Sequence, residues 1–196
     1  MLRILLLGQE SAGVQILNAL AATPHTIVGV VTDPSTGSIG GASVYKLARE
    51  QGYRLWPAAA VKHPDFVRQL RNDSIDIVLN AHSLYKINDD LINLPSIGAF
   101  NLHPSPLPRL AGLNSVSWAI YLDENRHGAT LHWMASKIDA GHIAYQHTFD
   151  ITDDDTPVSL MSQCIKHGVE LVQELLVTAA DNPDAIPRLS QALSKR

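Results

Sequence analysis

The sequence has one cysteine and no long apolar run. Cys164 is the only cysteine among 196 residues, so no disulfide can form within the chain, and this suits a reducing compartment. The apolar run at the start, residues 2–7, is interrupted by Arg3. A bilayer-spanning helix needs about 20 apolar residues. We therefore predict no signal peptide and no membrane span, and we expect a cytoplasmic protein.

Clustered positive charge is also missing. The chain carries 15 Lys and Arg against 19 Asp and Glu, a formal charge of -4, with no basic cluster. Because phosphate backbones are bound by such clusters, no nucleic-acid partner is expected. With 45% hydrophobic and 17% charged residues, the composition is that of an ordinary folded domain.

Several common catalytic motifs are absent. The stretch Gly8-Gln9-Glu10-Ser11-Ala12-Gly13 lacks the spacing of a dinucleotide loop, and Val14 and Gln15 stand where a nucleotide-triphosphate loop needs Lys and Ser or Thr. No G-x-S-x-G nucleophile motif occurs. Nine histidines are present, but none has the spacing of a common metal site. We expect no nucleotide loop, no serine or thiol nucleophile and no metal.

Strand and helix patterns alternate along the chain. Strands are predicted over residues 4–7, 26–32, 75–81, 98–102, 128–135 and 142–151. Helices are predicted after Ser11 as a cap, over residues 44–51, 61–72 and 114–122, and over 156–180, where Thr156 and Pro157 supply the cap and first-turn proline. A glycine-rich loop is predicted over residues 35–43.

This alternation indicates an α/β fold with a doubly wound, mostly parallel sheet and helices on both faces, as in Rossmann-like proteins. In that class, ligands bind beyond the carboxyl ends of the strands. We expect one domain over residues 1–180, followed by a tail over 181–196 that lies on the surface or frays.

The segment from Gly98 to Gly112 carries the most chemical information. Asn101 and His103 are two residues apart in a predicted strand, so they project to the same face and could together meet an oxyanion. Prolines at 104, 106 and 108 would hold the following loop extended and preorganise a pocket there. From pattern alone, the alternative of a proline-stiffened connection remains open.

The same segment resembles the signature of the 10-formyltetrahydrofolate-dependent formyltransferases, in which Asn-x-His-x-Ser-x-Leu-Pro is followed by a basic residue and a glycine. A second element of that family, an x-Asp-x-Gly turn some thirty-six residues after the histidine, is matched by Asp139. The similarity runs from the first strand through the helix after Thr156. It departs at Pro106, where leucine is usual, and at Leu110-Ala111, where an aromatic-basic pair is usual.

The resemblance implies a formyltransferase domain that uses 10-formyltetrahydrofolate as co-substrate and no metal. Asn101 and a protonated His103 would stabilise the oxyanion, and Asp139 would keep His103 protonated and handle the amine proton. The residues implied for contacts with the folate are Leu84, Tyr85, Lys86, Ile87, Ser105, Leu107, Pro108 and Ala135. Those implied for the acceptor are Gly8, Gln9 and Glu10.

The segment Gly8-Gln9-Glu10 restricts which amine can accept the formyl group. Enzymes that act on glycinamide ribonucleotide resemble one another in a Gly-Ser-Asn phosphate cradle at this place, so that acceptor is disfavoured. The first strand and the Asp33-Pro34 loop resemble those of the methionyl-tRNA and sugar-nucleotide formyltransferases more. It lacks the carboxyl-terminal domain of the tRNA enzymes, so the expected acceptor is a small primary amine, an amino sugar or an amino-acid-derived metabolite. A 10-formyltetrahydrofolate hydrolase and a non-catalytic folate-binding module remain alternatives, and the oligomeric state stays open.

Overall fold

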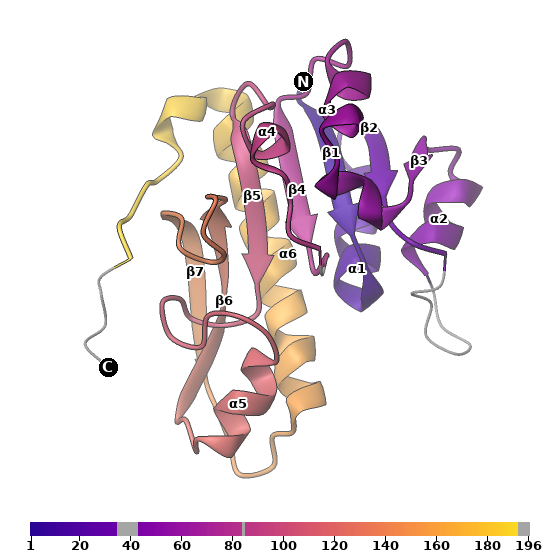
Figure 1. Ribbon diagram of the computed structural model, residues 1–196. Coiled ribbons are helices and arrows are strands. Elements are labelled where there is room, and N and C mark those ends of the chain that lie inside the picture. Colours follow the sequence, from indigo (N-terminus) through magenta and orange to yellow (C-terminus); the bar gives the residue numbers. More distant parts are fainter. Residues whose placement is uncertain (35–42, 84, 192–196) are drawn as a thin grey trace.

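A computed structural model describes residues 1–34, 43–83 and 85–191, and it contains one seven-stranded sheet of order β3-β2-β1-β4-β5-β6-β7 (Figure 1). The strands are β1 (Arg3–Gly8), β2 (Thr26–Val31), β3 (Leu55–Trp56), β4 (Ile77–Ala81), β5 (Gly98–His103), β6 (Arg126–Trp133) and β7 (Ile143–Asp150). Neighbouring strands from β3 to β5 pair in parallel, whereas β5 pairs antiparallel with β6 and β6 pairs antiparallel with β7. The predicted doubly wound, mostly parallel sheet is confirmed.

Helices cover both faces of the sheet. They are α1 (Glu10–Ala21), α2 (Val44–Glu50), α3 (Pro64–Leu70), α4 (Asp89–Ile92), α5 (Ser115–Tyr121) and α6 (Pro157–Asp181), with short 3-10 turns at Ala58–Lys62 and Pro183–Ala185. One hydrophobic cluster joins the sheet to α1 and α6, and the other joins it to α3 and α4. The long α6 runs behind the sheet in Figure 1, whereas α3 and α4 lie in front.

Strand β1 explains why its sequence is apolar without alternation. Ile4 and Leu6 pack into the cluster with α1 and α6, while Leu5 and Leu7 pack into the cluster with α3 and α4. All four side chains are fully buried. Successive side chains of a strand point to opposite faces, so a central strand covered on both sides needs apolar residues at every position.

The predicted helix starts are correct in one case and wrong in another. Thr156 accepts from the Ser159 amide and Ser159 reciprocates, which forms a capping box with Pro157 in the first turn, as predicted. Ser11 is not a cap, because α1 already begins at Glu10. The main-chain N–H of Gln9 donates to the Ala81 carbonyl at 3.1 Å, which ties this turn to β4.

Two other predictions differ from the structure. The helix predicted over residues 61–72 is a 3-10 turn followed by α3, because Pro64 has no N–H to donate and instead occupies the first turn of a new helix. The loop predicted over 35–43 lies outside the described residues except for Ser43, which caps α2 by accepting from the Lys46 N–H. The short β3 and α4 were not predicted.

The described part of the tail lies on the surface, one of the two predicted alternatives, and it packs against the sheet instead of fraying. Leu189 exchanges two main-chain hydrogen bonds with Ile143 at 2.9 and 3.0 Å, so the tail pairs with the start of β7. The Trp133 indole donates to the Pro187 carbonyl at 2.7 Å. Long-range pairing of this kind depends on a partner strand that lies far away in the sequence.

Cys164 is a buried core residue of α6, as predicted. Burial raises the pKa of its thiol to about 12, so it stays protonated and unreactive. Among the helices that the structure describes, none is long and apolar enough to cross a membrane.

Candidate functional site

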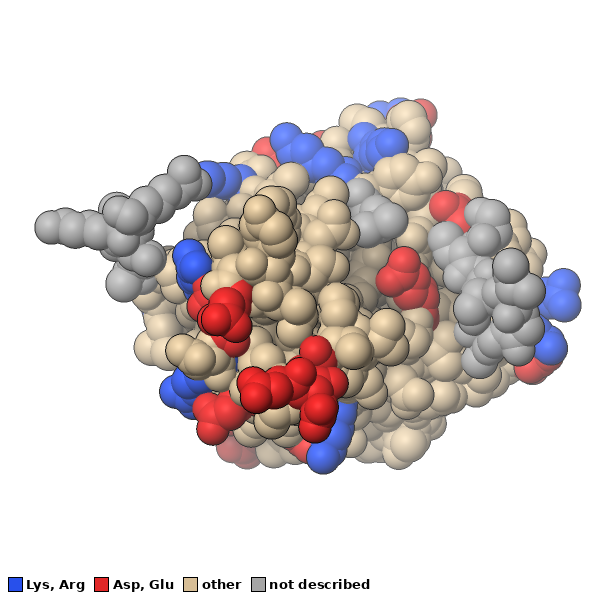
Figure 2. Space-filling view, turned by 90° about the horizontal axis from the view of Figure 1, so that it is seen from below, with Lys and Arg blue, Asp and Glu red and all other residues tan. Residues whose placement is uncertain are grey.

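A cavity of about 530 Å³ opens at the carboxyl ends of the central strands. Gly8 at the end of β1 lies opposite Ala81 of β4, and Asn80 lies opposite Asn101 of β5. The order of strands reverses between β1 and β4, and doubly wound sheets open a crevice at such a point. Figure 2 looks onto this edge of the sheet and shows it hollowed.

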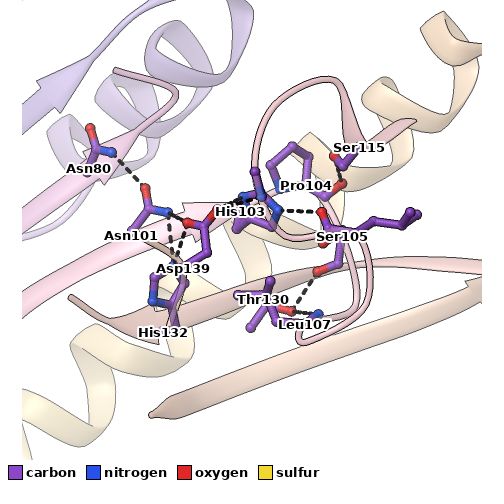
Figure 3. A network of polar contacts seen from close by, with 12 residues as sticks. Asn80, Asn101, His103, Pro104, Ser105, Leu107, Ser115, Thr130, His132 and Asp139 are labelled. Atoms are coloured by element: carbon purple, nitrogen blue, oxygen red, sulfur yellow. Dashed lines mark hydrogen bonds and ion pairs between the residues drawn. The ribbon is translucent and has the colours of Figure 1, made fainter. Parts of the chain in front are cut away.

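Asn101, His103 and Asp139 meet in this cavity (Figure 3). Strand β5 positions the first two, and the turn after β6 brings Asp139 between them. One Asp139 carboxylate oxygen lies 3.4 Å from the Asn101 amide nitrogen, and the other lies 3.5 Å from His103 Nδ1. Residues far apart in sequence thus form one polar group at the place that the fold class predicts.

Asp139 is held from several sides. The backbone of Asp139 is left-handed, with a φ of 52°, and its carboxylate accepts from the Gly112 main-chain N–H at 2.9 Å. Burial raises the pKa of Asp139, but the neighbouring His132 and His103 and the Gly112 N–H together lower it below the usual value. The carboxylate is therefore ionised at neutral pH.

His132 of β6 also belongs to this site, although the sequence did not single it out. It lies opposite Asn101 in the antiparallel register, with Nε2 3.0 Å from the Asn101 amide nitrogen and 3.5 Å from Asp139. Its Nδ1 is 2.9 Å from the Trp133 carbonyl. Because a carbonyl only accepts, Nδ1 carries the proton, and Nε2 accepts from Asn101. A polar residue in a predicted strand was the only signal, since pairing with β5 is not written in the sequence.

Asn80 is a second contributor that the sequence did not indicate. Its side-chain NH₂ group donates to the side-chain oxygen Oδ1 of Asn101 at 2.7 Å. This bond fixes which end of the Asn101 amide is which: the oxygen faces Asn80, and the nitrogen faces Asp139 and His132. Strand β4 therefore orients the donor of β5.

The structure corrects the expected charge of His103. Its pKa is lowered, because burial outweighs the opposing effect of Asp139, which does raise it as expected. His103 Nε2 is 3.1 Å from the Leu110 carbonyl and therefore donates to it. In the neutral ring, Nδ1 then has a free lone pair beside the Asp139 carboxylate. His103 is thus arranged to gain a proton rather than to hold one at rest.

The proline loop supports the site, and of its three prolines Pro104 lines the cavity whereas Pro106 and Pro108 do not. The Ser105 hydroxyl donates to the Arg109 carbonyl at 2.9 Å, and the main-chain carbonyl of Ser105 accepts from the Thr130 hydroxyl at 2.7 Å. The Leu107 N–H donates to the same hydroxyl at 3.1 Å (Figure 3). These buried bonds anchor the loop to β6, so the segment is rigid for tertiary reasons as well as for its prolines.

The remaining residues implied by the resemblance separate into two groups. Those that line the cavity are Glu10, Tyr85, Lys86, Ile87 and Ala135. Those that do not line it are Gly8, Gln9, Ser105, Leu107 and Pro108. Leu84 lies outside the described residues. Among the residues that are described, no group of three or more His, Cys, Asp or Glu side chains is arranged to hold a metal ion.

Comparisons with known proteins agree with this geometry. The sequence model described as formyl transferase matches residues 2–176. A phosphoribosylglycinamide formyltransferase from Anaplasma phagocytophilum superposes with a TM-score of 0.78 at 22% identity, covering 92% of this chain and 88% of that one. The corresponding enzyme from Coxiella burnetii gives 0.74 at 24% identity, covering 92% and 87%.

A third similar structure is an N-formyltransferase from Helicobacter canadensis in complex with folinic acid and dTDP-3-aminofucose. It has a TM-score of 0.76 at 19% identity, covering 99% of this chain and 69% of the other. At these identities the similar structures show only that the fold is shared. The family model matches most of the chain, residues 2–176, and therefore shows the family. The chain belongs to the formyl transferase family, and it is a formyltransferase.

Proposed function

We propose that this protein transfers a formyl group from 10-formyltetrahydrofolate to the primary amine of a small molecule, an amino sugar or an amino-acid-derived metabolite. One observation carries the proposal. An amide donor and two imidazoles converge on the Asp139 carboxylate inside a cavity large enough for a cofactor-sized ligand.

The cavity wall fits the chemistry of a folate. Ile87, Ile92 and Met134 supply apolar surface for a flat ring system, with Tyr85 beside them. Lys86, on the same segment, is the one cationic Lys or Arg among the described lining residues, and it suits the carboxylates of the folate tail. The folate would lie along the segment after β4, with its formyl group near Asn101.

In the proposed mechanism, negative charge develops on the formyl oxygen when the amine attacks. Asn101 is the preorganised donor for this charge, because Asn80 already directs its NH₂ group toward the reacting side, and the hydrogen in the long 3.4 Å contact with Asp139 would turn to the formyl oxygen. His103 takes up a proton at Nδ1 as the amine loses one, and it then supports the oxyanion as a cation. Preorganised donors aimed at developing charge are usually the largest catalytic term.

Asp139 would handle the proton by making Nδ1 of His103 a favourable place for it. A proton on that nitrogen lies between the imidazole and the ionised carboxylate, 3.5 Å away. His132 Nε2 lies at the same distance from the other oxygen, so it could hold the proton in turn. From there the proton can pass to the folate nitrogen that leaves.

The function is tested by supplying 10-formyltetrahydrofolate with a library of primary amines. We expect release of tetrahydrofolate, followed by absorbance, to depend on the amine, and mass spectrometry to find a formylated amine in equal amount. Free formate without any acceptor would instead identify a hydrolase. Cofactor binding without formate or formylated amine would identify a non-catalytic folate-binding module.

A further inference from the structure

The cavity has a second polar wall that the mechanism above does not use. It consists of Glu10, His82 and Ser83, which follow the ends of β1 and β4, and we name it the β1–β4 wall. Glu10 and His82 both have left-handed backbones, with φ of 55° and 60°. Such strain in residues with side chains is concentrated at functional sites.

The β1–β4 wall is negatively charged. The Glu10 side chain forms no salt bridge with any described residue, and no arginine is found among the described lining residues of the cavity. Burial is the main factor that lowers the pKa of His82 to about 4, and this leaves the imidazole neutral at physiological pH. The Ser83 hydroxyl is buried without a hydrogen-bond partner in the described chain. Only a carboxylate and neutral polar groups therefore face the cavity here.

The distance between this wall and the reacting centre is set by the sheet. Adjacent strands lie about 4.8 Å apart, so the end of β1 is about 10 Å from Asn101 on β5, and the end of β4 lies halfway. The Glu10 side chain shortens the first distance. An acceptor whose amine reaches Asn101 would thus place a second group, several bonds away, against the β1–β4 wall.

We propose that the β1–β4 wall selects acceptors whose far end carries hydrogen-bond donors, either an ammonium or hydroxyls, and rejects acceptors with an anionic group there. This rests on the proposed function, because it specifies the acceptor of that reaction. The wall accepts donors through the Glu10 carboxylate. A phosphate or carboxylate would be repelled by it, since no arginine is found among the described lining residues and Lys86, the one lysine there, would bind the carboxylates of the folate tail.

The test measures binding, so it does not depend on turnover. With folinic acid present, the affinities of putrescine, aminobutanol and γ-aminobutyrate, amines with the same four-carbon chain, are measured by calorimetry. The second ammonium of putrescine would form a charge-assisted hydrogen bond with Glu10, whereas the carboxylate of γ-aminobutyrate would be repelled. The affinity for putrescine should therefore exceed that for γ-aminobutyrate by about tenfold or more. A preference for putrescine over aminobutanol identifies an ammonium-selective wall, and equal affinity identifies a wall for donors in general.

Glu10→Gln should abolish most of the preference over γ-aminobutyrate, because the amide keeps the shape and removes the charge. Glu174→Gln, on the exposed face of α6, is the matched control and should retain it. Equal affinity of the wild type for putrescine and γ-aminobutyrate, no detectable putrescine binding at millimolar concentration, or an unchanged preference in Glu10→Gln would each overturn the proposal. Failure of formyl transfer with the preference intact would count against the proposed function alone.

A second inference concerns Gln191, which lies beyond the residues matched by the family model. Its side-chain amide donates to the carbonyls of Asp139 and Gly141 at 2.8 and 2.7 Å. Both hydrogens of one NH₂ group thus bridge the turn that presents the Asp139 carboxylate. The tail is held there separately, through Leu189 on Ile143 and Pro187 on Trp133.

We infer that Gln191 is a positioning residue, which keeps the Asp139 carboxylate against His103 and thereby supports the proton on Nδ1. Gln191→Met has a similar length and no donor, so the turn should relax while the rest of the tail stays in place. Asp139 raises the pKa of His103, so a displaced carboxylate should let that pKa fall further.

The direct measurement is the His103 pKa, by NMR titration of the wild type and Gln191→Met. Gln173→Met, on the exposed face of α6, is the control. We expect a lower His103 pKa in Gln191→Met only, together with a loss of kcat that exceeds the change in KM for 10-formyltetrahydrofolate. Gln191→Glu, which faces both carbonyls with an acceptor, should lower kcat further. An unchanged His103 pKa in folded Gln191→Met would contradict the inference, whatever happens to activity.

Discussion

Asp139→Asn is expected to lower kcat by about a hundredfold to ten-thousandfold, the usual contribution of a positioned acid or base. The amide keeps the size of the side chain, and it can still accept from the Gly112 N–H. It cannot stabilise a proton on His103 Nδ1 through charge, so proton transfer from the attacking amine loses its support. Steady-state kinetics with a saturating amine would measure the loss.

The pH dependence of this variant separates proton handling from simple binding. In the wild type, kcat/KM should fall as the pH drops through the His103 pKa, which lies below 6.5, because only the neutral ring can take up a proton. Asp139 raises that pKa. Removing its charge should therefore move the acid limb of the profile to lower pH. Wild-type rates across the whole pH range would show that Asp139 does not handle the proton.

His103→Ala and Asn101→Ala should each lower kcat by more than they weaken folate binding. A single lost oxyanion donor costs about 3 kcal/mol, more than a hundredfold in rate. Both side chains act on charge that develops only during reaction, so the affinity for folinic acid should change little. Calorimetry for the folate and steady-state kinetics for the reaction give the two numbers to compare.

Matched controls for this pair are His63→Ala and Asn18→Ala, which remove the same side chains from exposed positions. Asn101→Ala also leaves the Asn80 amide without its partner, so thermal melting must show that the variant is folded. Equal losses in kcat and in folate affinity would mark Asn101 and His103 as binding residues instead of catalytic ones.

Much of the fold could be predicted because its signals are local. The apolar run over residues 4–7 predicted the first strand, and Thr156-Pro157 marked the start of α6 within one turn of chain. The segment from Asn101 to Gly112 and the spacing to Asp139 pointed to the family, which the sequence model confirms. The wrong cap at Ser11 has a non-local cause, since β4 holds the turn before it.

The composition of the site depended on contacts between distant segments. His132 and Asn80 reach Asn101 only because β6 and β4 flank β5, and Gln191 reaches the Asp139 turn only because the tail pairs with β7. The resting charge of His103 is likewise a tertiary property. A sequence shows that a carboxylate can raise the pKa of an imidazole, but the balance against burial depends on how closely the folded chain packs around both.

The sequence by itself thus determined the class of sheet, the position of Asn101 and His103 on one strand face, and the family. Only the tertiary structure decided which side chains surround them, which nitrogen of each imidazole holds the proton, and that Glu10, which forms no salt bridge with any described residue, lines the same cavity. The physical reason is range. Strand alternation and helix caps involve neighbours in the chain, whereas charge, burial and hydrogen-bond partners in a site are set by residues that meet only after folding.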